Sequence, residues 1–528
     1  MQKKLGFLWI FCLGTALAAQ VPPGWNAQLP LGREQAVGTP WYGFGTWSAD
    51  HHGPPAALTD SLGFGNALTG NGLHLEAGVG TAHWDLAAQL VAVRDPAGHK
   101  RLDFYRGHAT WRSRPQGGWE LSLEREPMVW GYGLNGGYLL GEAACPFPRL
   151  RLETPMVNLH LGGVSLGTWG FQAFLGRLSG QEISPFSQYA EYQKALAGTQ
   201  GNPQSPYLDG FRVQARFGES LEFYANYLNL WGGSLNGRSL TEGYSTKEYI
   251  TAMFGIKDAL AEANVDPNSP TPVVGAYRNG AISASNADVG LRLRLGVLER
   301  RLSAQSVYVY LSRGSKNVWW NPAVFVYNPG RSIWDDTSTE AKRFVQGRFA
   351  AIWNNTGRYV GPNLASPNDS LGLLVAWANL RLGIEYLDTV NIQAQGVRSF
   401  NHYIYLSGFY YQGDPLGNAT AGEARTTTLR GEAELTPRLK ATTLVHLGSR
   451  PFRDTLAFWQ QAHPGLIPDI NRFFGLQQTL NWKLGPQATL NLGVAWQHQT
   501  AVQNVPGAEA NAFRYYTDLT FRWPSPRP

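Results

Sequence analysis

The segment FRYYTDLTFRW, residues 513–523, decides the fold class. Its odd-numbered positions carry Phe, Tyr, Thr, Leu, Phe and Trp, whereas its even-numbered positions carry Arg, Tyr, Asp, Thr and Arg. Because successive side chains of a β-strand point to opposite faces, one face of this strand is apolar and the other is polar and charged. A single strand of this kind can face a protein core or lipid. The number of such strands distinguishes the two.

The same alternation recurs along the chain, most clearly at 211–217, 221–227, 288–295 and 490–497. Tight turns such as Gly218–Ser220 join neighbouring strands into hairpins. Weaker candidates, including 343–353 and 402–412, bring the total to about 16 to 20 strands, the range of a large outer-membrane barrel. We therefore predict an all-β fold, a large antiparallel transmembrane β-barrel of about 18 strands.

The composition agrees with a barrel and excludes other classes. The 528 residues include 61 Gly, 12% aromatic residues and only 16% charged residues, and 43% of the chain is hydrophobic, which is enough to exclude disorder. Beyond the first twenty residues, no uninterrupted apolar run reaches the ~20 residues of a spanning helix. A barrel alternates polar and apolar residues, so it remains polar on average while one face of each strand contacts lipid.

The N-terminus predicts export. Lys3 and Lys4 precede the apolar stretch 5–17, which ends in an Ala-Leu-Ala cleavage signal, so residues 1–18 are expected to be a signal peptide. The mature chain keeps 42 basic and 38 acidic residues, a net charge of +4 that is too dilute to indicate a nucleic-acid partner. It keeps one cysteine, Cys145, and therefore no internal disulfide. We expect a periplasmic lead-in at 19–70, the barrel at 71–523 and a tail at 524–528.

The connections between strands differ in length, which predicts the orientation. Long insertions at 178–207, 230–286, 314–342 and 449–471 contrast with the short turns and are expected to be extracellular loops. The second insertion should contain a short helix that begins after Ser245, which forms an S-x-x-E capping box with Glu248. We expect its apolar stripe to pack on the barrel mouth or in the lumen.

No motif indicates catalysis. The chain lacks G-x-S-x-G, H-E-x-x-H, C-x-x-C and Walker sequences, and its histidines show no ligand spacing, so we expect no enzyme activity, no metal and no cofactor. Paired carboxylates occur at Glu124 and Glu126 and at Asp335 and Asp336, and such a pair could serve a glycosidase. Acids inside a barrel more often form ion pairs with lumen arginines, which is the interpretation we favour.

One loop has a composition suited to sugar. Carbohydrate sites combine exposed aromatic rings with side chains that donate and accept hydrogen bonds. The insertion at 314–342 has this make-up, and its candidate polysaccharide-binding residues are Trp319, Trp320, Arg331, Trp334, Asp335 and Asp336. The alternative is that these tryptophans belong to the aromatic girdle that barrels carry at the membrane interface.

Two further stretches resemble a known family. Residues 125–154, REPMVWGYGLNGGYLLGEAACPFPRLRLET, are similar to the signature segment of the capsule-assembly Wzi family, and 405–417, YLSGFYYQGDPLG, resemble a second strand and loop of that family. The positions that match its structural motifs are Trp130, Gly131, Gly133, Pro146, Pro148, Gly408, Gly413 and Gly417. The chain departs from the motif at Ala143 and Cys145.

The resemblance implies an eighteen-stranded outer-membrane barrel that acts as a surface lectin. Its implied partners are exported capsular or other extracellular polysaccharide, outer-membrane lipid and the polysaccharide export machinery. The alternative from another class is a porin for sugars or other small solutes, in which lumen residues such as Arg212, Arg216, Arg292 and Arg294 would set selectivity. A lumen plugged by inward-folded loops would favour the lectin, and a continuous water path would favour the porin.

Overall fold

The computed structural model describes residues 42–52, 71–81, 83–94, 100–115, 118–134, 139–141, 146–179, 202–235, 237–253, 283–316, 319–321, 324–326, 369–388, 410–411, 414–417, 424–450 and 456–523. Within these ranges, no helix is both long enough and apolar enough to cross a membrane.

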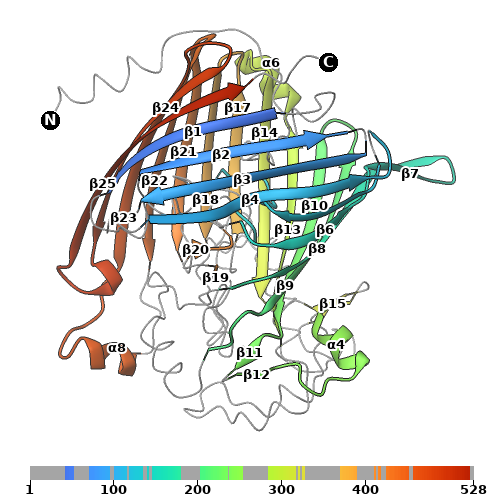
Figure 1. Ribbon diagram of the computed structural model, residues 1–528, viewed down its shortest axis with the longest axis horizontal. Coiled ribbons are helices and arrows are strands. Elements are labelled where there is room, and N and C mark those ends of the chain that lie inside the picture. Colours follow the sequence, from blue (N-terminus) through green and yellow to red (C-terminus); the bar gives the residue numbers. More distant parts are fainter. Residues whose placement is uncertain are drawn as a thin grey trace, which may run out of the picture.

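Eighteen antiparallel strands form a closed ring, the wall seen in Figure 1. In ring order they are β1 (Tyr42–His52), β2 (Asn71–Gly80), β3 (Trp84–Arg94), β4 (Lys100–Arg112), β5 (Glu120–Arg125), β6 (Arg149–Glu153), β8 (Val164–Arg177), β9 (Tyr207–Phe217), β10 (Leu221–Trp231), β13 (Ser283–Arg294), β14 (Ser306–Lys316), β17 (Asp369–Ala376), β18 (Leu380–Asp388), β21 (Arg425–Thr436), β22 (Leu439–Arg450), β23 (Asn471–Lys483), β24 (Ala488–Thr500) and β25 (Glu509–Trp523). Strand β1 pairs with both β2 and β25, which closes the ring of eighteen strands. The predicted all-β barrel of about 18 strands is confirmed.

A nineteenth strand extends the wall on one side. Strand β7 (Val157–Leu161) follows β6 after residues 154–156 and pairs with the same edge of β8 as β6 does. Among the described residues, small hairpins lie outside the ring: β11 (Ser234–Leu235) with β12 (Arg238–Ser239), β15 (Trp319–Asn321) with β16 (Val324–Val326), and β19 (Tyr410–Tyr411) with β20 (Asp414–Pro415). The helices of this described part are α4 (Thr246–Met253), α6 (Gly296–Leu302), α8 (Leu456–Ala462) and the 3-10 turn η2 (Val502–Asn504).

The two ends of the barrel differ. Turns such as 218–220, 377–379 and 484–487 lie at one end, together with α6, whereas the long connections, α4 and α8 lie at the other, at the bottom of Figure 1. We take the short-turn end as periplasmic and the long-loop end as external, following the common pattern of such barrels. Exposed tryptophans mark the short-turn end, as expected at a membrane interface: Trp84, Trp111, Trp119 and Trp482.

The alternation of side chains sets the two faces of the wall. On β5, Leu121 and Leu123 are exposed on the outside, whereas Ser122 and Glu124 are buried on the inside. The exposed apolar face is the one that contacts lipid, and the buried polar face lines the lumen. The core of this protein lies inside the ring and is mixed, with polar and charged side chains of the wall buried beside apolar ones.

One boundary predicted from the sequence is wrong. The barrel was expected to begin at residue 71, but β1 (Tyr42–His52) lies within the expected lead-in and closes the ring between β2 and β25. Its sequence, YGFGTWSADHH, has glycines and no clean alternation, and it forms a strand because it has hydrogen-bonding partners on both sides. The signal peptide, the rest of the lead-in and the tail lie outside the described residues.

The structure also bears on two candidate strands and on the expected helix. Strand β14 pairs directly with β17, and β18 with β21, so the ring closes without the candidate strands 343–353 and 402–412, which lie outside the described residues apart from Tyr410 and Tyr411. The expected helix is present as α4. Its Ala252 is buried against the wall, but Tyr249 and Ile250 remain exposed, so the apolar stripe is only partly packed.

Candidate functional site

The connection between β5 and β6 folds into the lumen. We call its described parts, residues 126–134, 139–141 and 146–148, the plug. Its two arms meet where the Trp130 backbone N–H donates to the Leu140 carbonyl over 2.9 Å, an antiparallel bridge. Gly131 follows with φ +132°, a conformation that side chains disfavour and glycine tolerates. Five apolar side chains of the plug are completely buried: Trp130, Leu134, Leu139, Leu140 and Phe147.

Trp130 fixes the near side of the plug. Its ring packs against Phe174 of β8 at 5.3 Å, and its indole N–H donates to the Gln172 side-chain oxygen over 2.6 Å. The wall makes room for these rings at Gly210 of β9, where a Cβ would lie 2.7 Å from Trp130 and 2.4 Å from Phe174. Glycine at this position is therefore required by the close approach of the plug.

Leu134 fixes the far side. Its N–H donates to a carboxylate oxygen of Glu385 on β18 over 2.8 Å, and its carbonyl accepts a bond from Arg430 on β21 over 3.3 Å. Its side chain packs with Tyr310 of β14 and Leu374 of β17. Strand β18 lies eight places from β5 around the ring of eighteen, nearly opposite. The plug therefore crosses the lumen from one wall to the other.

The middle of the plug is held by rings and charges. Tyr132 contacts the edge of Tyr224 on β10 at 5.0 Å, and the guanidinium of Arg292 on β13 lies 4.6 Å from the centre of its ring. Arg292 forms an ion pair with Glu222, and Tyr224 donates to Asp288 over 3.3 Å. Among the arginines that would have set porin selectivity, Arg292 is thus engaged with the plug and with Glu222, and Arg216 and Arg294 form ion pairs with Glu222 and Glu299.

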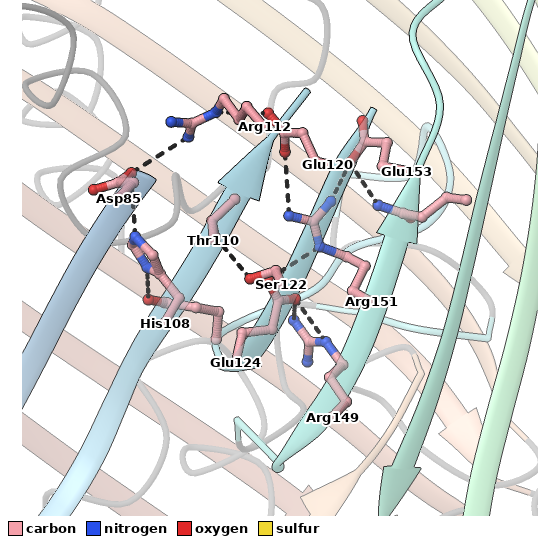
Figure 2. Close-up of polar contacts among 12 residues, drawn as sticks. Asp85, His108, Thr110, Arg112, Glu120, Ser122, Glu124, Arg149, Arg151 and Glu153 are labelled. Carbon is pink, nitrogen blue, oxygen red and sulfur yellow. Dashed lines mark hydrogen bonds and ion pairs between the residues drawn. The ribbon is translucent and has the colours of Figure 1, made fainter. Parts of the chain in front are cut away.

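A ladder of ion pairs lines the wall beneath the plug, across β3, β4, β5 and β6 (Figure 2). His108 lies 3.2 Å from Asp85 and 3.0 Å from Glu126. Glu124 accepts from Arg149 over 2.7 Å and from Arg151 over 3.0 Å. Glu124 and Glu126, one of the two carboxylate pairs considered for catalysis, therefore both have basic partners. Among the described residues, no group of His, Cys, Asp and Glu is arranged to hold a metal ion.

Four aromatic residues gather at the long-loop end, and we call them the aromatic platform: Tyr207, Trp231, Tyr244 and Tyr249. Tyr207 stacks on Trp231 at 4.9 Å, Trp231 meets Tyr249 edge-on at 6.4 Å, and Tyr249 contacts Tyr244 at 5.7 Å. Trp231 is buried, whereas Tyr249 is 42% exposed. The platform therefore presents ring surface to the outside on a buried aromatic base.

Polar groups position and surround the platform. The Asn229 amide of β10 donates to the carbonyls of Ala252 and Met253 over 2.6 and 3.0 Å, which attaches α4 to the wall. The guanidinium of Arg177 lies 5.8 Å from the ring of Tyr207. The Tyr249 hydroxyl donates to Thr241 over 3.3 Å. The Asn229 amide and the Thr241 side chain are buried and hold the platform in place. Exposed aromatic ring surface beside the guanidinium of Arg177 is suited to a carbohydrate.

The site and motif residues predicted from the sequence lie in different parts of the protein. Trp319 and Trp320 lie in the hairpin β15–β16, with no described side chains, and Arg331, Trp334, Asp335 and Asp336 lie outside the described residues. Of the motif positions, Trp130, Gly131 and Gly133 lie in the plug, as do Pro146 and Pro148; the Pro146 carbonyl accepts from Arg125 over 3.0 Å, and the Pro148 carbonyl accepts from the Arg177 N–H over 3.2 Å. Gly417 is buried beside Leu416, whose carbonyl accepts a bond from Gly141 of the plug, whereas Gly408 and Gly413 lie outside the described residues.

The aromatic platform was not among the sites predicted from the sequence. The available signal was the position of Tyr207 and Trp231 at strand ends, each beside a long insertion, and of Tyr244 and Tyr249 around the expected helix.

Comparisons with known proteins agree with this description. Residues 75–270 match the model of the capsule assembly protein Wzi family, which confirms the resemblance seen in the sequence. Wzi of Escherichia coli, an outer-membrane protein involved in group 1 capsule assembly and described as a carbohydrate-binding β-barrel, is similar in structure with a TM-score of 0.58 at 15% identity, over 93% of this chain and 86% of that one. OprD of Pseudomonas aeruginosa gives a TM-score of 0.44 at 10% identity, over 96% of this chain and 98% of that one. No curated protein matches the sequence. The fold and the family match both indicate the outer membrane.

Proposed function

From the premise that residues 75–270 match the Wzi capsule-assembly family, we propose that this chain is an outer-membrane lectin. It binds exported capsular or other extracellular polysaccharide at its long-loop end and helps to attach or assemble that polysaccharide at the cell surface. The observation that carries the proposal is the plug, which crosses the lumen between β8, where Trp130 bonds Gln172, and β18, where Leu134 bonds Glu385.

The plug weakens the porin alternative. A diffusion channel needs a continuous water path lined by polar groups that are free to meet the solute. Here buried apolar side chains and an arginine bound to Tyr132 and Glu222 occupy the middle of the barrel. A rigid closed barrel is instead a suitable support for a binding surface at its mouth.

The aromatic platform supports sugar binding in particular. Sugar rings have apolar C–H faces that pack on aromatic rings, and their hydroxyls require nearby donors and acceptors. Tyr249 and Tyr244 supply the rings, and the Tyr249 hydroxyl and the Arg177 guanidinium supply polar groups within the same cluster. We include Trp319, Trp320, Arg331, Trp334, Asp335 and Asp336 in the proposed surface on the composition of their loop alone.

We also propose that the protein performs no chemistry on the polysaccharide. General acid catalysis of glycoside cleavage requires a carboxyl group that can reach the glycosidic oxygen. Glu124 and Glu126 are buried in the wall and face Arg149, Arg151 and His108 instead.

The test combines conductance with binding. Full-length protein in planar bilayers should give no large, stable channel steps, and vesicles carrying it should be retained by immobilised surface polysaccharide from the producing cell. Tyr249→Ala should weaken retention about tenfold, the loss of about 1.4 kcal/mol. The matched control is Ile250→Ala, the next residue of α4, which is exposed but has no ring contact and should bind normally. Large open-channel steps, or equal retention by an uncharged dextran, would overturn the proposal.

A further inference from the structure

The hairpin of β7 and the first residues of β8 extends beyond the rest of the wall. We call residues 157–167 the ribbon; it is visible at the right of Figure 1. On one side, the neighbouring strand β5 begins at Glu120, which pairs with Glu153, the last residue of β6. No described strand therefore reaches far enough to pair with the outer edge of β7. On the other side, the pairing of β8 with β9 begins only at Thr168. The ribbon thus has two free edges.

The described chain leaves the outer part of the ribbon uncovered. All five residues of β7 are exposed, and Leu161 and Val164 at the tip are 71% and 63% exposed. The turn between them is Gly162–Gly163, and a Cβ added at either glycine would meet no atom within 4 Å. The tip stands free, although it carries some of the most exposed large apolar side chains of the described residues.

The two faces of the ribbon differ in polarity. Val157, Leu159, Leu161, Val164 and Leu166 form the apolar face. The opposite face carries Asn158 hydrogen-bonded to Thr168, and His160 paired across from Ser165. The stretch VNLHLGGVSLGTW, residues 157–169, contains no Asp, Glu, Lys or Arg, although 16% of the whole chain is charged. The ribbon is therefore amphipathic without formal charge.

The apolar face continues the lipid-facing surface of the barrel. Val157 lies directly across from Trp169, which packs on the exposed ring of Phe217 at 6.0 Å and donates its indole N–H to the Leu166 carbonyl over 2.7 Å. Farther along β8, Leu175 is exposed on the same outer face. The ribbon lies at the short-turn end, where exposed Trp84, Trp111 and Trp119 mark the membrane interface.

We propose that the ribbon is a membrane-contacting element that inserts its apolar face into the periplasmic leaflet of the outer membrane. Its free backbone edges would be costly in hydrocarbon, so the ribbon lies at headgroup depth, with its edges and its polar face in contact with water and headgroups. Interfacial amphipathic helices bind membranes in the same orientation. The occupant of the apolar face is phospholipid, and neither a second copy of the chain nor another protein is required to cover it.

The test places one probe on each face of the ribbon. In full-length protein that carries Cys12→Ser and Cys145→Ser, Leu161→Cys and Ser165→Cys variants are each labelled with an environment-sensitive fluorophore and reconstituted in phosphatidylethanolamine–phosphatidylglycerol vesicles. Folding is checked by heat-modifiable electrophoretic mobility. Nitroxide-labelled acyl chains should quench the Leu161 probe about threefold more than the Ser165 probe, and aqueous iodide should show the opposite preference.

Two outcomes would overturn the proposal. If iodide quenches both probes equally and acyl nitroxides quench neither, the ribbon stands in the aqueous periplasm. If unlabelled Leu161→Cys protein crosslinks into dimers in vesicles and its probe is shielded from nitroxide, the apolar face is covered by a second copy. Neither outcome bears on polysaccharide retention, so the proposed lectin function stands or falls separately.

Discussion

The backbone N–H of Leu134 donates a hydrogen bond to the carboxylate of Glu385 over 2.8 Å, between residues 251 positions apart. The Tyr310 hydroxyl donates to the same carboxylate oxygen. Because both donors and the acceptor are completely buried, this contact fixes the plug to the wall opposite its origin.

Glu385→Ala should release the plug. The substitution leaves the Leu134 N–H and the Tyr310 hydroxyl unpaired, at about 1–3 kcal/mol for each buried donor. We expect the variant to show transient channel openings in planar bilayers that the parent chain lacks. Glu509→Ala, at an exposed glutamate of β25, is the control and should stay closed. A closed Glu385→Ala variant would show that other contacts suffice to hold the plug.

Trp130→Ala should be among the more destabilising single changes. It removes a fully buried indole that packs on Phe174 and bonds Gln172, and large-to-small changes of this kind cost about 3–5 kcal/mol. The measurement is urea unfolding in detergent micelles. Trp482→Ala, at an exposed tryptophan on the lipid side, removes the same side chain without leaving an internal cavity and should cost far less.

Gly210→Ala and Gly431→Ala should differ sharply, although both add one methyl group to a wall strand. At Gly210 the new Cβ would lie 2.4 Å from Phe174, 2.7 Å from Trp130 and 2.8 Å from Leu228. At Gly431 the nearest atom is 3.5 Å away, an ordinary contact. We expect a loss of about 1–3 kcal/mol at Gly210 and little change at Gly431. Equal midpoints of urea unfolding would contradict the placement of the plug.

Glu124→Gln should destabilise the ladder of ion pairs. The change leaves Arg149 and Arg151 buried without a full counter-charge, and breaking such a pair costs about 3–5 kcal/mol. Glu219→Gln is the control because Glu219 is 91% exposed and lies 3.8 Å from its partner Arg294. The urea unfolding midpoint of Glu124→Gln should lie well below that of the parent chain, whereas the midpoint of Glu219→Gln should stay close to that of the parent chain.

Glu299 of α6 should make the short-turn end sensitive to acid. Burial raises the pKa of this carboxyl, but hydrogen bonds from Arg294 and from the Val307 N–H outweigh it, so the pKa lies below its ordinary value of 4.5. The ionised carboxylate of Glu299 therefore contributes its full stabilisation of the folded protein above pH 4.5, and this contribution is lost as the pH falls through the lowered pKa. The stability difference between the parent chain and Glu299→Gln should shrink over that range. A constant difference would contradict the expectation.

The alternation of neighbouring residues was sufficient to predict many strands of the wall. Period-2 alternation located strands such as Leu221–Trp231 and Glu509–Trp523, because the strand itself dictates which side chains face lipid. Strand β1 escaped detection because Gly43 and Gly45 interrupt its alternation, and its place depends on partners β2 and β25. The platform escaped because Tyr207, Trp231 and Tyr249 come from separate segments that only the folded chain brings together.

The sequence by itself determined that this chain is a barrel with a polar interior, since alternation and turn lengths are properties of neighbouring residues. It also marked 125–154 as a segment that resembles a family signature, with Trp130 as one of its motif positions. Only the tertiary structure decided that this segment crosses and closes the lumen. The physical reason is distance along the chain: Leu134 meets Glu385, Tyr310 and Arg430, and no local pattern reports partners so far away in sequence.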